Sequence, residues 1–321
     1  MFKVCLAGTY PAGTYESIVE ALPSDIFEVV KADTQEKMHA VTDADMIILR
    51  VLKMPKESFE HFTNLKMVMR WGVGYDSVDI EEAGHRGVLV CNTPGANAYA
   101  VAELAVGLMI DLGRNIFGYY SNIKNNNWDR NVFSSNQSLN GKTVGLVGGG
   151  NIGRQVTKRV QAFGAKVCYY DAFRLPEALE QEFGLTYCEL DEVLKRSDIV
   201  SLHVPLLDST RHIISAEKLA LMKPTAKIIN TARGGLIDDA ALLEALKKGA
   251  LAGAGLDCVE AEEGEVTEAL LQMPNVIVTP HIGGTTNDLG SAIIPMLLEN
   301  IVLLQAEKSV KYVVNQQYLS I

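Results

Sequence analysis

The chain has 321 residues and a formal net charge of −10, with 48% hydrophobic and 21% charged residues. This length exceeds what one hydrophobic core usually supports, so we expect two domains, and the composition is that of a soluble globular protein. The negative charge, with no local cluster of Lys and Arg to offset it, argues against nucleic acid or an anionic membrane surface as a partner.

The first residues, the longest apolar stretch and the cysteines bear on where the protein is located. Residues 1–8 form a short strand-like run rather than a secretory leader, and Glu103 and Asp111 interrupt the longest apolar stretch, residues 98–112. We therefore expect a cytoplasmic protein that does not cross a membrane. The five cysteines are scattered without Cys-x-x-Cys spacing, which predicts reduced thiols and no zinc site.

Short apolar runs alternate with helical patterns through the first 91 residues, and such alternation predicts a parallel, doubly wound sheet. The predicted strands cover residues 2–7, 27–30, 46–51, 65–69 and 88–91, and the predicted helices cover residues 15–22, 56–62 and 79–85.

A helix is predicted from residue 98 to about 116, and its apolar residues on most faces indicate burial between two bodies. A loop rich in Asn and Ser, residues 122–140, follows. A second alternating series then predicts strands at residues 143–147, 166–170, 199–203, 227–230, 252–257 and 276–279, and a last helix at about 288–304. The predicted fold class is therefore α/β, with two doubly wound parallel-sheet domains.

A glycine-rich turn opens the second series: residues 145–153 read GLVGGGNIG, between a predicted strand and a predicted helix. Gly148 allows a tight turn, Gly150 lets the backbone approach a pyrophosphate, and Gly153 permits close packing of helix on strand. Asp171 ends the next strand, where a carboxylate accepts hydrogen bonds from the adenosine ribose. Together these features predict a Rossmann domain that binds a dinucleotide.

The choice between NAD and NADP depends on two residues. Asp171 favours NAD, because a ribose 2′-phosphate there would meet a like charge. Arg174 either pairs with such a phosphate or covers the adenine, so NADP remains the minor alternative. His203, at the end of another predicted strand, is a candidate wall of the cofactor pocket.

Polar residues at the carboxyl ends of strands are the candidates for chemistry, because ligands of doubly wound sheets bind there. Arg233, Asp257 and His281 follow three such strands, and Glu262 lies in the acidic loop 260–265. A guanidinium holds a carboxylate through two hydrogen bonds, an imidazole exchanges a proton, and an acid beside it favours its charged form. This set suits hydride transfer on a hydroxy or keto acid, although spacing does not choose among the acids of the loop.

At this point the chain resembles the D-isomer-specific 2-hydroxyacid dehydrogenases over nearly its whole length. The motifs that carry the likeness are RWGVGYD at 70–76, NTPG at 92–95, the glycine motif, SLHVP at 201–205, NTARGG at 230–235 and PHIGG at 280–284. The resemblance implies a flavodoxin-like substrate domain of residues 1–98 with 288–321, a Rossmann NAD-binding domain of residues 99–287, and a homodimer.

The resemblance also implies site residues. The catalytic set is Arg233, Glu262 and His281, and the family pattern is what selects Glu262. The cofactor contacts are Val73, Gly148, Gly150, Asn151, Ile152, Gly153, Asp171, His203, Val204, Pro205, Thr231, Ala232, Arg233, Asp257, His281, Gly283 and Gly284. The substrate contacts are Arg50, Val73, Gly74, Asn97, Arg233 and His281.

Three departures from the family pattern bear on the substrate. Val51 stands where many relatives have a hydroxyl residue, Ala98 where they have Thr or Ser, and Glu263 where a proline usually follows the catalytic glutamate. The first two argue against a phosphorylated substrate. The expected function is hydride transfer between NAD(H) and a small D-2-hydroxy acid or 2-keto acid. The alternatives are an NAD(H)-sensing, corepressor-like binding protein and a formate- or phosphite-type dehydrogenase.

Overall fold

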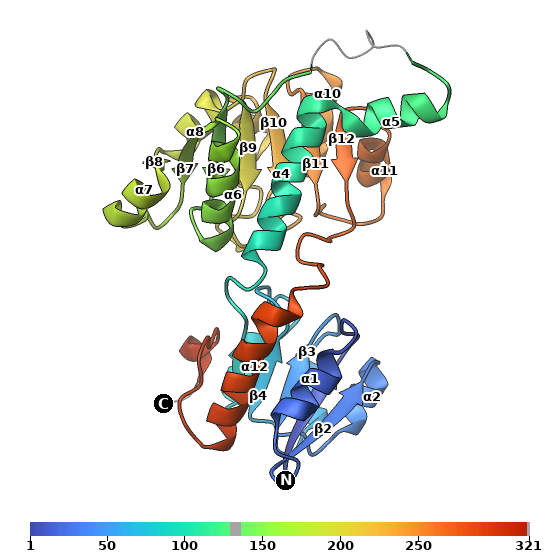
Figure 1. The fold of residues 1–321 in the computed structure, drawn as a ribbon, viewed down its shortest axis with the longest axis vertical. Helices are drawn as coiled ribbons and strands as arrows, with labels where there is room; N and C mark the ends of the chain where they lie inside the picture. The colour runs from blue at the N-terminus through green and yellow to red at the C-terminus, as the bar shows by residue number, and fades with distance from the viewer. Residues whose placement is uncertain (129–135, 320–321) are drawn as a thin grey trace. The chain divides into compact units, whose positions relative to one another are not determined.

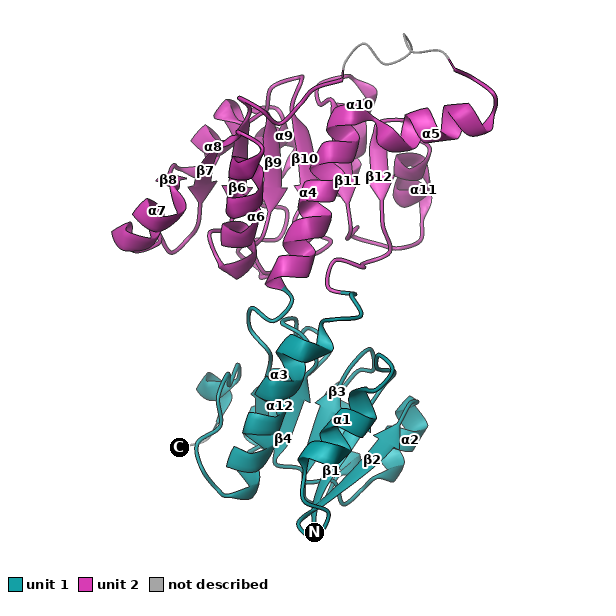
Figure 2. Ribbon diagram, viewed as in Figure 1, with its two compact units in different colours: residues 1–97, 285–321 teal, residues 98–284 magenta. Residues whose placement is uncertain are grey.

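The computed structural model describes residues 1–128 and 136–319 (Figure 1). The chain divides into two compact units, residues 1–97 with 285–321 and residues 98–284 (Figure 2). Each unit is built on one sheet whose neighbouring strands are parallel, which confirms the predicted fold class. Residues 129–135, in the middle of the predicted Asn- and Ser-rich loop, lie outside the described residues.

The first unit has a sheet with the order β2-β1-β3-β4-β5, which is the flavodoxin-type order. Its strands are β1 (Phe2–Ala7), β2 (Phe27–Ala32), β3 (Met46–Leu49), β4 (Met67–Arg70) and β5 (Leu89–Cys91). Its helices are α1 (Thr14–Ala21), α2 (Gln35–Ala40), α3 (Ile80–His85), α12 (Gly290–Gln305) and the 3₁₀ helices η1 (Lys56–His61) and η2 (Gln316–Tyr318).

Burial explains why this sheet forms. All four residues of β3 are buried, as expected for a central strand of a parallel sheet covered on both faces. Helix α12 comes from the far end of the chain, and its Ile293 and Leu297 pack in one core with Val4 and Met69. The C-terminal segment is therefore part of the core of the first unit.

The second unit has a sheet with the order β12-β11-β10-β9-β6-β7-β8, and the order reverses between β6 and β9. Its strands are β6 (Thr143–Val147), β7 (Lys166–Tyr170), β8 (Thr186–Tyr187), β9 (Ile199–Leu202), β10 (Lys227–Asn230), β11 (Gly253–Leu256) and β12 (Val276–Val278). Its helices are α4 (Ala98–Arg114), α5 (Ile116–Lys124), α6 (Asn151–Ala162), α7 (Glu177–Phe183), α8 (Leu190–Arg196), α9 (Ala216–Leu219), α10 (Asp239–Lys247) and α11 (Glu265–Leu271). Such a reversal is where doubly wound sheets bind ligands.

The long predicted helix ends two residues early. Asn115 adopts the left-handed conformation with φ 50°, which interrupts the helix, and α5 then extends to Lys124, inside the segment predicted to be irregular. Helix α4 packs closely on the sheet, since a Cβ added at Gly255 of β11 would lie 3.1 Å from Leu108 Cβ. Among the described residues, no helix has the length and apolarity needed to cross a bilayer.

Candidate active site

The glycine turn between β6 and α6 has the geometry that its sequence predicts. Gly148 has φ +113°, and a Cβ added to it would lie 2.5 Å from the His203 carbonyl oxygen. A Cβ added to Gly153 would lie 2.2 Å from the Gly148 oxygen, so only glycine fits these two positions. Gly150, at the start of α6, has nothing within 4 Å of its added Cβ. This open space lies at the N-terminus of a twelve-residue helix whose first turn carries no acid, which fits a pyrophosphate.

Asp171 follows β7 and is fixed beside this turn. Its Oδ2 accepts a hydrogen bond from Gly149 N at 2.8 Å, and its Oδ1 accepts one from Phe173 N at 3.1 Å. The carboxylate is therefore held in place by backbone groups next to the glycine turn, where the ribose of a dinucleotide is expected.

Arg174 has a partner within the fold. Its Nε and Nη2 each donate to a Glu180 oxygen at 2.9 Å, and Tyr169 donates to the same carboxylate at 2.7 Å. The Arg174 guanidinium and the Tyr169 hydroxyl lower the pKa of Glu180 to about 2. A bidentate pair of this kind anchors α7 and leaves Arg174 committed to Glu180 rather than to a phosphate.

Two buried polar atoms at the carboxyl ends of neighbouring strands have no partner among the described residues. They are His203 Nδ1 and Thr231 Oγ1, directly after β9 and β10. The other ring nitrogen, His203 Nε2, lies 2.9 Å from Ser201 Oγ, and burial lowers the pKa of His203 to about 3. The imidazole is thus neutral at physiological pH. Because buried polar groups are nearly always hydrogen-bonded, these two atoms fit a polar ligand such as the predicted dinucleotide.

The segment that carries Arg233 is fixed by one amide. Asn230 Nδ2 donates to the Arg233 carbonyl at 2.8 Å, and Asn230 Oδ1 accepts from Ala232 N at 3.1 Å. Arg233 Nη1 donates to the Ala232 oxygen at 2.7 Å. A Cβ added at Gly234 would lie 1.9 Å from the Val259 oxygen, so the turn after Arg233 packs directly on the segment that follows β11.

Asp257 organises the loop that carries His281. The residue is 1% exposed, and its carboxylate accepts from Thr279 Oγ1 at 2.5 Å, Ile282 N at 2.9 Å and Gly283 N at 2.8 Å. The Asp257 carbonyl also accepts from His281 N at 3.0 Å. His281 is exposed with φ +53°, an uncommon backbone conformation for a residue other than glycine. Asp257 therefore fixes the position of the loop that carries the His281 imidazole.

Glu262 is exposed in the loop between β11 and α11. Its neighbour Glu260 is already engaged, because Glu260 Oε1 lies 3.0 Å from His212 Nε2 and 3.6 Å from Arg211 Nη1. Within the described chain, no hydrogen bond or ion pair joins Glu262 to His281. The structure thus places Arg233, Asp257 and His281 at the ends of three adjacent strands, and the pairing of Glu262 with His281 stays a prediction.

The predicted substrate residues of the first unit lie beyond the carboxyl ends of β3, β4 and β5. Arg50 follows β3 and donates through Nη1 to the Thr9 oxygen. The Val73 oxygen accepts from Asn92 Nδ2 at 2.7 Å, and the Gly74 oxygen accepts from Arg70 Nε at 3.0 Å. Asn97 precedes α4, and its buried Oδ1 has no partner among the described residues.

Sequence reasoning gave no role to three residues that support the site. Ser201 contacts His203, Asn230 fixes the Arg233 segment, and Thr279 binds Asp257. Each is a polar residue at or next to the carboxyl end of a strand, which is the signal that would have identified it. In the described ranges no cluster of three His, Cys, Asp or Glu side chains is arranged to hold a metal ion.

The fold and the site together define a class of protein. A strand, a glycine turn and a helix at the reversal of a doubly wound sheet, with an acid after the next strand and Arg and His nearby, are typical of a dinucleotide-dependent oxidoreductase. Residues 106–283, more than half of the chain, match the family described as D-isomer specific 2-hydroxyacid dehydrogenase, NAD binding domain. The chain belongs to the D-isomer-specific 2-hydroxyacid dehydrogenase family.

Individual relatives agree with this assignment. A hydroxypyruvate reductase of Thermotoga maritima is 42% identical over 257 residues, 79% of this chain and 82% of that one. A glyoxylate reductase of Thermococcus litoralis is 38% identical over 290 residues, 88% and 87% of the two chains. A D-lactate dehydrogenase of Lactobacillus jensenii, solved with NAD⁺, is similar with a TM-score of 0.79 and 31% identity over 98% and 99% of the chains.

The protein is therefore an NAD-dependent oxidoreductase that transfers a hydride between NAD(H) and a small D-2-hydroxy acid or 2-keto acid. The comparisons do not favour the alternatives of a corepressor-like sensor or a formate- or phosphite-type dehydrogenase.

Proposed function

We propose that the substrate is a short, unphosphorylated 2-keto acid of the size of glyoxylate or hydroxypyruvate. The observation that carries this proposal is Val51, which directly follows Arg50. Val51 has φ +69° and is 67% exposed, and Leu52 N donates to the Arg50 oxygen at 2.8 Å across it. This is a tight turn centred on a β-branched residue, a strained arrangement. It presents an apolar side chain where many relatives have a hydroxyl that can donate to phosphate.

The proposed roles follow from the chemistry of the side chains. Arg233 binds the substrate carboxylate through two parallel hydrogen bonds and polarises the adjacent carbonyl. NADH, when bound, supplies the hydride. Protonated His281 donates a proton to the carbonyl oxygen, and Glu262 keeps the imidazole charged. Arg50, the Val73–Gly74 backbone and Asn97 hold the carboxylate end of the substrate.

Apart from Val73, the cofactor contacts are assigned to the second unit, which we propose as the NAD-binding domain, with the first unit as the substrate domain. The N–H groups at Gly150, Asn151 and Ile152 face the pyrophosphate, and Asp171 binds the ribose. The remaining proposed contacts are Val73 of the first unit and, in the second unit, Gly148, Gly153, His203, Val204, Pro205, Thr231, Ala232, Arg233, Asp257, His281, Gly283 and Gly284.

A homodimer is part of the proposal. Helix α5 has no buried residue, and Ile116, Phe117, Tyr120 and Ile123 are all exposed. Residues 116, 120 and 123 recur at helical spacing, and residue 117 lies three positions before residue 120, so all four form one apolar stripe. A second copy of the chain covers this stripe, because large apolar patches rarely stay exposed.

A cytoplasmic location is likewise proposed and is supported by the free cysteines, of which four are buried.

A panel of 2-keto acids with NADH tests the proposed substrate class. We expect kcat/KM for glyoxylate and hydroxypyruvate to exceed that for 3-phosphohydroxypyruvate by at least tenfold, measured as NADH consumption. Val51→Ser should narrow this ratio, because the new hydroxyl can donate to phosphate. A wild-type preference for the phosphorylated acid would overturn the proposal.

A further inference from the structure

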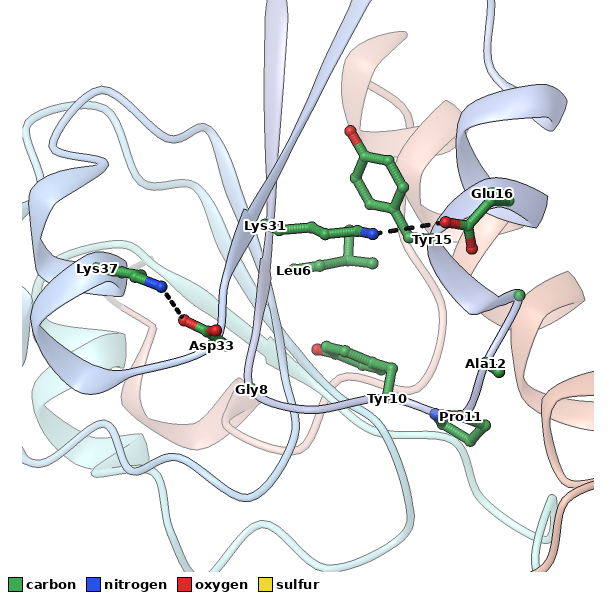
Figure 3. A pocket seen from close by; sticks show the side chains of 11 residues that line it. Leu6, Gly8, Tyr10, Pro11, Ala12, Tyr15, Glu16, Lys31, Asp33 and Lys37 are labelled. Carbon is green, nitrogen blue, oxygen red and sulfur yellow. Dashed lines mark hydrogen bonds and ion pairs between the residues drawn. The ribbon is translucent and has the colours of Figure 1, made fainter.

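A cavity of about 520 Å³ opens in the first unit at the carboxyl ends of β1 and β2, beside the start of α1 (Figure 3). This volume is within the range of pockets that hold small molecules, about 300–1,000 Å³. None of the residues assigned to the substrate lines it. Its walls come from β1, the loop from Gly8 to Gly13, the first turn of α1, the end of β2 and α2.

The charges of the cavity are balanced. Lys31 Nζ lies 3.5 Å from Glu16 Oε1, and Lys37 Nζ lies 2.7 Å from Asp33 Oδ1. Figure 3 shows these as two separate pairs, one formed with α1 and the other with α2. An ammonium carries three N–H donors and a carboxylate has two oxygens, so each group keeps hydrogen-bonding capacity after the pairs are made.

Lys31 is the more available of the two ammonium groups. Its contact with Glu16 is at the limit of a hydrogen bond, and its other close neighbour is the Tyr15 ring, with Nζ 4.0 Å from the ring centroid. Lys31 and Asp33 are two residues apart at the end of β2, and both line the cavity. Lys31 and Asp33 thus place a donor and an acceptor of opposite charge in the same cavity.

The chemical class of the ligand follows from this balance. An anion alone would meet two carboxylates, and a cation alone would meet two ammonium groups. A molecule that carries both charges satisfies both signs, and Leu6, Pro11 and Ala12 offer apolar surface for a short side chain. We propose that this cavity binds a small zwitterion, an α-amino acid with a short side chain, whose carboxylate contacts Lys31 and whose ammonium contacts Asp33.

The wall of the cavity is tied to Arg50. The Thr9 oxygen accepts from Arg50 Nη1, and a Cβ added to Gly8 would lie 1.7 Å from the Arg50 oxygen. Tyr10 donates to the Ile48 oxygen at 2.6 Å, so the loop is bound to β3 at a second point. A ligand that shifts this loop shifts Arg50. The amino acid and the keto acid therefore change each other's affinity by the same factor. This coupling rests on the proposed function of Arg50, whereas binding to the cavity does not.

Isothermal titration calorimetry on the whole protein tests the site with three probes. We expect L-alanine to bind at least tenfold more tightly than propionate, which has only the anionic charge, or ethylammonium, which has only the cationic one. Lys31→Met and Asp33→Asn should each weaken L-alanine binding at least fivefold. Lys66→Met is the matched control, because Lys66 forms an ion pair with Asp45 at 3.0 Å in the same unit but does not line the cavity.

Ala12→Phe fills the cavity without touching its charges and should also abolish binding. Circular dichroism establishes that each variant is folded. No binding of L-alanine, equal binding of propionate, or undiminished binding by both charge variants would overturn the site.

The coupling predicts that saturating L-alanine changes KM for glyoxylate at least twofold with kcat unchanged. Binding without that change would refute the link to Arg50. An enzyme inactive on glyoxylate would refute the proposed substrate, and calorimetry would still decide on the site.

Discussion

Arg233 and His281 owe their positions to the polar side chains of neighbouring residues. Asn230 holds the Arg233 segment through both ends of its amide, and Asp257 holds the His281 loop through three hydrogen bonds. The motifs predicted both the Arg and the His. They did not predict this support, because a hydrogen bond across two strands depends on register, which a single sequence does not show.

The sequence did not determine the partner of Arg174 or the choice of Glu262 among the acids of its loop. The sequence left Arg174 open to a phosphate, because its partner Glu180 lies on a helix six residues further on. The acidic loop offered several candidates, and the structure engages Glu260 with His212. The exposed Glu262 and Glu263 are not distinguished by any contact in the described chain. Local spacing cannot choose between side chains that are both exposed.

Arg233→Lys tests the proposed substrate anchor. The charge survives, but an ammonium lacks the planar pair of donors that binds a carboxylate. We expect kcat/KM for the keto acid to fall at least a hundredfold, while NADH affinity changes little. Steady-state kinetics and NADH fluorescence titration measure the two quantities. Retention of most activity would show that another residue anchors the substrate.

At the scale of elements, periodicity predicted most of both sheets, because buried parallel strands are continuous apolar runs bounded by turn residues. Strand β8 was not predicted, since it is two residues long, and no bounds were predicted from the sequence for helix α2 or for helices α7 to α11. Residues 56–61 form a 3₁₀ rather than an α-helix, and β3 ends at Leu49, before the turn at Val51. Asn115 ends α4 through its own backbone conformation, which hydrophobicity does not report.

Helix α7 is anchored by the pair of Arg174 and Glu180, and this anchor depends on pH. The pKa of Glu180 is about 2 in the folded chain, below the value near 4.3 expected when unfolded. The pair therefore stabilises the fold fully above the unfolded value, and this contribution is lost as pH falls toward the folded value. We expect Glu180→Gln to lower the melting midpoint at pH 7, with a smaller difference from wild type at pH 3.5.

Glu177→Gln is the control for this comparison, because Glu177 lies on the same helix and is exposed. Its melting midpoint should follow that of the wild type at both pH values. An equal loss for Glu180→Gln at pH 7 and pH 3.5 would show that packing, rather than the charged pair, is what the substitution removes.

At the scale of the whole molecule, the proposed homodimer can be tested at the apolar stripe of α5. Phe117 is 67% exposed, and placing a charge there should disrupt an apolar interface. We expect light scattering to give the wild type a mass twice the 35.0 kDa of one chain, and Phe117→Glu the mass of one chain. Phe173→Glu, an exposed aromatic outside α5, should remain a dimer. A monomeric wild type would contradict the proposed assembly.

Paired pH profiles of keto acid reduction and hydroxy acid oxidation test whether Glu262 keeps His281 protonated for catalysis. Keto acid reduction needs imidazolium and hydroxy acid oxidation needs neutral imidazole. In Glu262→Gln, the alkaline limit of reduction and the acid limit of oxidation should both move to lower pH by about one to two units, when chemistry limits the rate. Glu263→Gln, one residue away, should keep the wild-type limits. Unmoved limits in Glu262→Gln, with the shift appearing in Glu263→Gln, would contradict the assignment of the catalytic acid.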